Sequence, residues 1–428
     1  MSYRAGDAAR RARERYELKQ AAAEFYRKLS VTERLEEALN STFCLGPEDV
    51  YGHLANYFAQ FSKPPTICQI RGRKVLDGTG EPTVEAEVFC TVKNMDKRIC
   101  SSVISAASEH PKASKGPEQE SNHSADIAIQ WLNDLSPKLR GMSPDEQNKI
   151  DQLLSDFYQP KIEEEKERRQ MEREASPMPL QPEPSPVTSP APGKKKGSGK
   201  GKKAAVVEKP IPPEETPEAV VPGSPAIGAL SLAVAKASSV LSKTPLYLHI
   251  RALRNEKLPT EFFMPTPMIS ILSCGTSSPG KLNLMKEVLI IPQTGLTVQQ
   301  SLDMALMLQN QIVKQINAAS KTGDTVQWES LAKALGSKCY LFADAASKPV
   351  CKLLESGSMN SPPCSGTVIK HTNEITISQL LGVFKLIEGE NRVAVLGCPY
   401  KESVGDSTAD LAVGLGARFV KLGGLLRG

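Results

Sequence analysis

Short apolar runs recur along the C-terminal part of the chain, namely KCYLFAD, GTVIKH, RVAVLGC and ARFVKLGG. Amphipathic or small-residue segments with a helical pattern separate them: KPVCKLLESG, TISQLLGVFKLIEG and TADLAVGL. Continuous apolar strands that alternate with helices are typical of a parallel sheet with both faces covered. The pattern therefore predicts an α/β fold for this part of the chain.

Two further strands of the buried type, MISILSC and EVLIIP, precede these runs, and the amphipathic helix TVQQSLDMALMLQNQIVKQI follows them. The segment PAIGALSLAVAKASSVL, which ends at residue 241, is apolar or small on every side. A helix without a polar face is normally buried, so we expect this one to lie in a core.

The region from Cys68 onward has the alternation of a hairpin. In CQIRGRKVLDGTGEPTVEAEVFCTV, two strand-like runs flank DGTGEP, whose Asp-Gly and Gly-Glu-Pro steps favour a turn. Residues 123–158 then have a helical pattern, and Ser-Pro steps at 136 and 143 indicate turns or helix starts.

The N-terminal region is rich in helix formers over residues 7–40, where Ser30 or Thr32 could cap a helix. The next segment, GPEDVYGHLANYFAQFSKPP, spaces its apolar residues at helical intervals until the prolines stop it. Two roles for this apolar face stay open. It packs onto the rest of the chain, or it associates with a second copy or a partner helix.

Residues 161–223 are dominated by charge and proline, as in KIEEEKERRQMERE, SPMPLQPEPSPVTSPAPGKKKGSGKGKK and EKPIPPEETPEAVVPGSP. Burial of the few apolar residues here would not compensate the conformational entropy that the segment loses when it becomes ordered. We therefore predict a disordered insert with a solvated helix at its start. It serves as a solubilising linker, or its lysines contact an acidic tail or a filament surface.

Composition narrows the class of protein. The 428 residues are 40% hydrophobic with a net charge of +5, and part of that charge lies in the single cluster GKKKGSGKGKK, which argues against a nucleic-acid-binding surface. The nine cysteines never form a CxxC pair, so we expect reduced thiols and no zinc site. The N-terminus has no apolar leader, and we expect a cytosolic protein that is neither secreted nor membrane-spanning.

Charged or small residues end the apolar runs: Asp344, Lys370, Gly397 with Cys398, and Lys421. Their spacings of 26, 27 and 24 residues match one strand and one helix each. In an eight-stranded β/α barrel the carboxyl ends of the strands meet at the active site, so these side chains would converge. The alternative is that strand ends simply tolerate charge.

These motifs, in this order, resemble the enolase family, the phosphopyruvate hydratases. The segments that carry the resemblance are RGRKVLDGTGEPTVEAEV, AIGALSLAVAKASSVLSKTPLYLHI, LNLMKEVLIIP and TADLAVGLGARFVKLGG. The resemblance implies a small α+β domain followed by a β/α barrel. We divide the chain into a helical extension (1–62), an N-terminal-like domain (63–160, completed by 224–250), the insert (161–223) and an incomplete barrel (251–428).

The resemblance also implies Mg²⁺-dependent dehydration of 2-phosphoglycerate to phosphoenolpyruvate, a step of glycolysis. On the matching positions, Lys370 would be the proton acceptor, and Glu287 and Lys421 would contact the substrate. Asp344 would bind the metal, and Ser108 would be a serine of the metal loop.

Several family motifs are missing. The Gly-Asp-Glu-Gly-Gly loop and the strands ending in Met-Asp-Val-Ala-Ala-Ser and Ile-Glu-Asp-Pro have no counterpart, so we infer a deletion of two barrel strands near residues 313–335, with two metal carboxylates. LGCPYKES replaces the Ser-His-Arg-Ser-Gly segment. We therefore expect little or no activity from this chain.

The helical N-terminus and the insert resemble a divergent, sperm-type branch of the family. That likeness implies a cytoplasmic protein of the flagellum. It also implies a homodimer or a pairing with other enolase subunits, or binding to a flagellar scaffold. The alternative function is accordingly that of a non-catalytic interaction protein.

Overall fold

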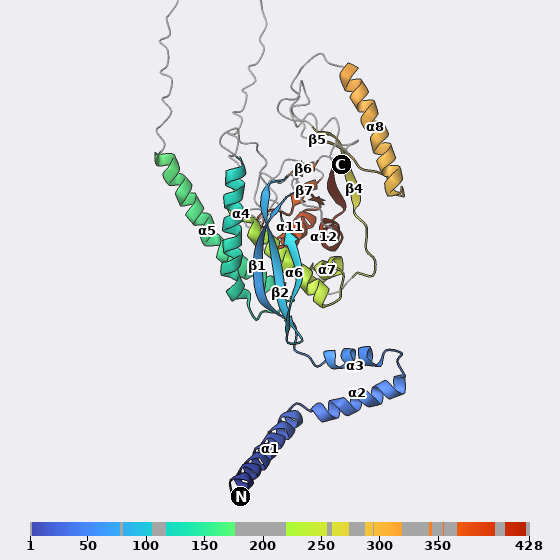
Figure 1. The fold of residues 1–428 in the computed structure, drawn as a ribbon. Helices are drawn as coiled ribbons and strands as arrows, with labels where there is room; N and C mark the ends of the chain where they lie inside the picture. The colour runs from blue at the N-terminus through green and yellow to red at the C-terminus, as the bar shows by residue number, and fades with distance from the viewer. Residues whose placement is uncertain are drawn as a thin grey trace, which may run out of the picture. The chain divides into compact units, whose positions relative to one another are not determined.

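The structure is a computed structural model, drawn in Figure 1. It describes residues 2–77, 80–104, 117–175, 220–254, 259–273, 287–293, 295–318, 342–344, 354, 366–398 and 407–424. The chain divides into two compact units: Met1–Thr66 with Cys90–Lys97, and Ile67–Phe89 with Arg98–Gly428. The domain boundaries drawn from the sequence stay predictions.

Three helices make up most of the first unit: α1 (Ser2–Lys28), α2 (Val31–Leu45) and α3 (Val50–Ala59). Gly46, at φ 54°, ends α2 and donates its N–H to the carbonyl of Thr42. Ser30 stands at the start of α2 but makes no capping hydrogen bond, so that part of the predicted cap is wrong. Ser30 has a φ of 50°, in the left-handed region, whereas capping residues typically adopt an extended backbone.

The small sheet has the order β1 (Thr66–Leu76), β2 (Pro82–Val92), β3 (Met95–Val103). The predicted hairpin turn is confirmed, because the Asp77 and Glu81 backbones close it with an N–H···O distance of 2.8 Å. The carboxylate of Asp77 also accepts the N–H of Glu81 at 2.9 Å. The next turn holds Lys93 and Asn94 at φ 52° and 62°, as a two-residue hairpin loop requires.

Four helices accompany this sheet in the sequence: α4 (Pro117–Leu139), α5 (Gln147–Ala175), α6 (Pro225–Leu241) and α7 (Leu246–Arg254). The prediction of a buried small-residue helix is confirmed, since most of α6 is inaccessible to solvent. The Ser-Pro step at 136 does not mark a boundary, because Pro137 lies inside the last turn of α4. The helix α5 runs on to Ala175, and residues 176–219 of the predicted insert lie outside the described residues.

In the described ranges, no single helix combines the length and hydropathy needed to cross a membrane; only α6 and α7 together do, as a pair bent by 109°.

The large sheet has the order β5-β4-β9-β8-β7-β6. Figure 1 labels four of its strands, β4, β5, β6 and β7. All of its described neighbours are parallel except β4 and β5. The strands are β4 (Thr266–Ser273), β5 (Glu287–Ile290), β6 (Phe342–Asp344), β7 (Gly366–Lys370), β8 (Val393–Gly397) and β9 (Phe419–Gly424). The α/β class is thus confirmed, whereas a closed or incomplete barrel stays a prediction.

Both faces of the large sheet are apolar. One face carries a buried cluster made by Met268, Val368, Val395 and Phe419. The helix α8 (Val298–Ala318) covers the other face, where Ala305 and Leu302 pack against Ile269. The helix α11 (Ile377–Gly389) packs on β8, and α12 (Ser407–Leu415) packs on β9. The alternation of side chains along a strand therefore separates a helix-covered face from the face that carries the cluster.

Candidate functional site

The two lysines that end apolar runs lie at one level of the large sheet. Lys370, the last residue of β7, pairs with Gly397 of β8, and Gly397 pairs in turn with Lys421 of β9. Because neighbouring strands lie about 4.8 Å apart, the Cα atoms of the two lysines are about 10 Å apart. The predicted convergence of these two strand ends is found in the fold.

Both lysines point to the face of the sheet that carries the apolar cluster. Val368 and Phe419, which each stand two residues before a lysine, belong to that cluster. Since side chains two residues apart in a strand share a face, Lys370 and Lys421 share it as well. The lysines thus continue the buried layer at the carboxyl ends of the strands, where ligands bind in sheets of this type.

Gly397 makes room between the two lysines. A Cβ atom at this position would lie 2.8 Å from Cγ1 of Val368 and 3.2 Å from Cγ of Lys370. The aliphatic part of Lys370 therefore lies over the glycine. Just beyond it, the N–H of Cys398 donates to the carbonyl of Lys421 at 2.7 Å and keeps β8 and β9 paired.

The other predicted site residues are not all brought to this level. Asp344 pairs with Val368, two residues before Lys370 along β7. Glu287 is the first residue of the antiparallel strand β5, and it pairs with Ser273, the last residue of β4. Its backbone therefore lies at the carboxyl end of β4, as the lysines lie at the carboxyl ends of their strands, but beyond Met268, the partner of Lys421. The side chains of Asp344 and Glu287 lie outside the described residues, as does the whole of Ser108.

The described residues do not fit a magnesium ion. Among them, no three side chains of His, Cys, Asp or Glu come together as a metal site. The edge presents two lysines at one level and a single predicted ligand, Asp344, two residues away. Since Mg²⁺ prefers several oxygen ligands and ammonium groups repel it, we derive no step through a metal here.

A buried loop follows Lys370. The ring Nε2 of His371 lies 2.8 Å from the carbonyl oxygen of Ile375, and burial lowers the pKa of His371 to about 4. Burial also raises the pKa of the Glu374 carboxyl above its ordinary value. The pattern Thr-x-x-Gln at Thr376 to Gln379 forms a capping box at the start of α11. That motif was visible in the sequence, whereas the buried histidine had no sequence signal.

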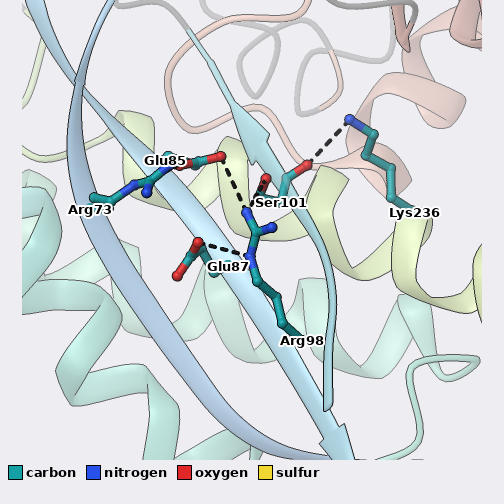
Figure 2. Close-up of polar contacts among 6 residues, drawn as sticks. All are labelled: Arg73, Glu85, Glu87, Arg98, Ser101 and Lys236. Carbon is teal, nitrogen blue, oxygen red and sulfur yellow. Dashed lines mark hydrogen bonds and ion pairs between the residues drawn. The ribbon is translucent and has the colours of Figure 1, made fainter.

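A second charged cluster lies on the small sheet (Figure 2). Glu85 accepts hydrogen bonds from Arg73 at 2.6 and 3.0 Å, and Arg98 lies 2.9 Å from Glu87. Arg98 also donates to the Ser101 hydroxyl at 3.1 Å. Each carboxylate thus has a guanidinium partner, which suits a structural network better than proton transfer.

Comparison with known proteins gives relatives that match nearly the whole of this chain. The chain is 82% identical to "Enolase 4" of Xenopus tropicalis, with 100% of this chain and 92% of the relative covered. It is 38% identical to "Enolase 4" of Homo sapiens, over 97% of this chain and 86% of that protein. Against "Enolase 4" of Danio rerio the identity is 31%, over 96% and 88%. No protein-family model matches the chain.

The chain is shorter than its relatives inside the aligned region. The alignment with the Xenopus tropicalis protein takes in all 428 residues but runs over 525 positions, which is 97 more than the chain has. Segments of that relative therefore have no counterpart here. Their place near residues 313–335 stays a prediction.

Proposed function

Because the chain belongs to the enolase family, among the proteins named enolase 4, we propose that its large sheet carries an enolase-type site for a small phosphorylated carboxylate. The compound that we propose is 2-phosphoglycerate, with phosphoenolpyruvate as the product of the family's reaction. The observation that carries the proposal is the pairing of Lys370 and Lys421 with the same glycine.

The geometry suits a dianionic ligand. The two ammonium groups start from one face and one level of the sheet, and the missing side chain of Gly397 leaves space between their stems. A lysine binds a phosphate or carboxylate as a point charge with three N–H donors. Two such groups, with a buried apolar layer beneath them, would hold the two ends of one small anion.

In the family's reaction, Lys370 would take the proton next to the carboxylate, and Lys421 would stabilise the charge that develops. Glu287 would contact the substrate, and Asp344 and Ser108 would belong to the metal site. Magnesium, when bound, supplies charge to hold the enolate. Because segments of the Xenopus tropicalis relative have no counterpart in this chain, we propose that it binds the anion and turns it over far more slowly than a complete enolase.

Titration calorimetry with 2-phosphoglycerate tests the binding proposal. Lys370→Ala and Lys421→Ala should each weaken binding about tenfold or more, because each removes a charged partner of the ligand. Lys385→Ala is the matched control, since Lys385 is exposed on α11. Binding that is absent in the unaltered chain, or equal in all variants, would contradict the proposal.

A Mg²⁺-dependent assay of phosphoenolpyruvate formation tests the second part. We expect the 428-residue chain to form phosphoenolpyruvate far more slowly than a complete enolase does. Rapid turnover that Lys370→Ala abolishes would show a competent enzyme and would contradict the proposal of slow chemistry.

The helical first unit supports a second candidate function, a non-catalytic interaction protein of the sperm flagellum. Within α1, α2 and α3 the only buried hydrophobic residue among those whose exposure is described is Ala38, whereas Phe43 is 90% exposed. The hydroxyl of Tyr57 on α3 donates to Glu37 of α2 at 2.8 Å, and Arg34 of α2 donates to the same carboxylate at 2.7 Å. A polar contact thus joins α2 to α3, while Phe43 stays exposed.

We propose a flagellar scaffold, a second copy or another enolase subunit as the partner of this unit, in the cytoplasm of the sperm tail. Double substitution of Leu39 and Phe43 by serine should abolish recruitment of the tagged chain to the flagellum. Sedimentation equilibrium separates a homodimer from a monomer. Unchanged recruitment of the double variant would contradict this role for the unit.

A further inference from the structure

We infer that Asp151 of α5 is a positioning residue for Lys370, because it fixes the start of α11 and with it the loop that follows the lysine. The inference rests on the proposed function only for the role of Lys370 in binding the anion. The geometric link between Asp151 and Lys370 stands on contacts within the second unit.

The first amides of α11 are all accounted for. A helix leaves its first N–H groups without intrahelical partners. Here the N–H of Ile377 donates to the hydroxyl of Ser231 at 2.9 Å, and the N–H of Ser378 donates to Asp151 at 2.9 Å. The N–H of Gln379 donates to Thr376 within the capping box. Two of these three acceptors come from other helices, α5 and α6.

Asp151 is built into this place. The residue is 2% exposed, and its two carboxylate oxygens accept four hydrogen bonds. One oxygen takes the Ser231 hydroxyl at 2.7 Å and the Gln147 amide at 2.9 Å. The other takes both the N–H and the hydroxyl of Ser378, the latter at 2.6 Å. A carboxylate at a helix N-terminus is also favoured by the helix dipole.

The helix α6 holds the same loop at a second point. The N–H of Gly228 donates to the carbonyl of Asn373 at 3.0 Å, and Asn373 has a φ of 52°. Gly228 and Ser231 stand three residues apart, so they lie on one side of α6, one turn from each other. The residues between Lys370 and α11 are therefore fixed by α6 in the middle and by Asp151 with Ser231 at the end.

The arrangement leaves Lys370 little freedom to move along its strand. The lysine ends β7, and the loop of residues 371–376 leads directly into the anchored start of α11. A small shift of a group that contacts a ligand weakens its action strongly. Loss of the Asp151 contacts would release the loop and displace Lys370 from its level beside Gly397.

The test compares Asp151→Asn with Asp145→Asn in the full chain. Asparagine keeps the size of Asp151 but puts an N–H₂ donor against donors. Asp145 is a matched control, because it also accepts a hydrogen bond from a serine of α6, Ser238, but it makes no contact with α11 among the described hydrogen bonds. Competitive acetylation with mass spectrometry gives the labelling rate of Lys370 relative to Lys385, the exposed lysine of α11.

We expect the relative rate of Lys370 to rise at least about threefold in Asp151→Asn, because local opening exposes the amine, and to stay unchanged in Asp145→Asn. Affinity for 2-phosphoglycerate should fall about tenfold in the first variant only. Hydrogen exchange of the Ile377 and Ser378 amides should become faster in the same variant. Faster exchange with an unchanged rate of Lys370 overturns the inference, because Asp151 then supports α11 alone.

Ser378→Ala covers the case in which Asp151→Asn does not fold. It removes one of the four hydrogen bonds and should raise the relative rate of Lys370 in the same direction; an unchanged rate overturns the inference. If the unaltered chain does not bind 2-phosphoglycerate while the rate of Lys370 still responds to Asp151→Asn, the proposed ligand is wrong and the positioning role is supported.

Discussion

Lys370 and Lys421 are held apart by a single residue without a side chain, because both pair with Gly397. Alanine at this position would place its Cβ 3.2 Å from Lys370 and 2.8 Å from Val368. We expect Gly397→Ala to push the lysine aside and to lower the affinity for 2-phosphoglycerate about tenfold.

Gly389→Ala serves as the control for Gly397→Ala, because a Cβ there meets nothing within 4 Å. Calorimetry on both variants should separate them clearly. Equal affinities would show that the ligand does not use the space over Gly397.

The contact between α6 and the loop after β7 predicts an unusual sign for a glycine substitution. Alanine inside a helix is ordinarily about 1 kcal/mol more favourable than glycine. At Gly228, however, the Cβ would lie 2.3 Å from the carbonyl oxygen of Asn373. We expect Gly228→Ala to lower the free energy of unfolding by about 2 kcal/mol or more, as measured by urea denaturation. An unchanged free energy of unfolding would contradict the prediction and would mean that the loop around Asn373 moves away from the added methyl group without loss of stability.

The neutral His371 predicts a pH dependence. Its pKa of about 4 in the folded state lies below the ordinary value of 6.5, so between these pH values the unfolded state binds a proton and the folded state does not. Stability should therefore fall as the pH drops from about 6.5 towards 4, by about 2 kcal/mol between about pH 7 and about pH 5 from this group.

His371→Gln removes this titration and keeps an amide donor for the carbonyl of Ile375. Denaturation curves at both pH values should show a smaller loss in the variant than in the unaltered chain. The same loss in both proteins would place the pH dependence in other groups.

Glu85 also predicts a loss of stability in acid, but here the group is a carboxylate that is ionised in the folded state. Burial raises the pKa of its carboxyl, but hydrogen bonds from Ser101 and Arg73, with the charges of the arginines, lower it more. A depressed acid stabilises the fold above its unfolded pKa and loses that effect as the pH falls through the folded value.

Glu85→Gln should therefore cost about 1 to 2 kcal/mol at neutral pH and less in acid, by urea denaturation. Glu163→Gln is the control, because Glu163 is exposed and pairs with Lys166 on the surface of α5. It should change stability by less than about 0.5 kcal/mol. A cost for Glu85→Gln that does not shrink in acid would contradict the ionised role.

Local patterns in the sequence predicted most elements correctly, because they depend on nearby residues. The turn at Asp77 and the buried helix α6 follow from turn chemistry and from an all-round apolar surface. The common level of Lys370 and Lys421 follows from the regular spacing of strand and helix.

The features that the sequence did not reveal depend on distant partners. The direction of β5 is not encoded in a short apolar run, so its antiparallel pairing, which brings the backbone of Glu287 to the edge, was not predictable. Asp151 and Ser378 meet across 227 positions, and neither residue has a local pattern that points to the other. Pro137 lies within the last turn of α4, against the ordinary tendency of proline to end a helix.

The hydrogen bonds of Asp151 to Ser231 and Ser378 also join the pieces of chain on either side of residues 176–219. A single cut in that interval would leave α5 on one fragment, and α6 with α11 on the other. The buried carboxylate would lie on one fragment and two of its hydrogen-bond donors on the other, which would stabilise the complex of the two fragments. We expect a chain cut in this interval to purify as a complex of both fragments and to unfold in one cooperative transition. The two fragments are therefore not independent folding units, although one is synthesised before the other.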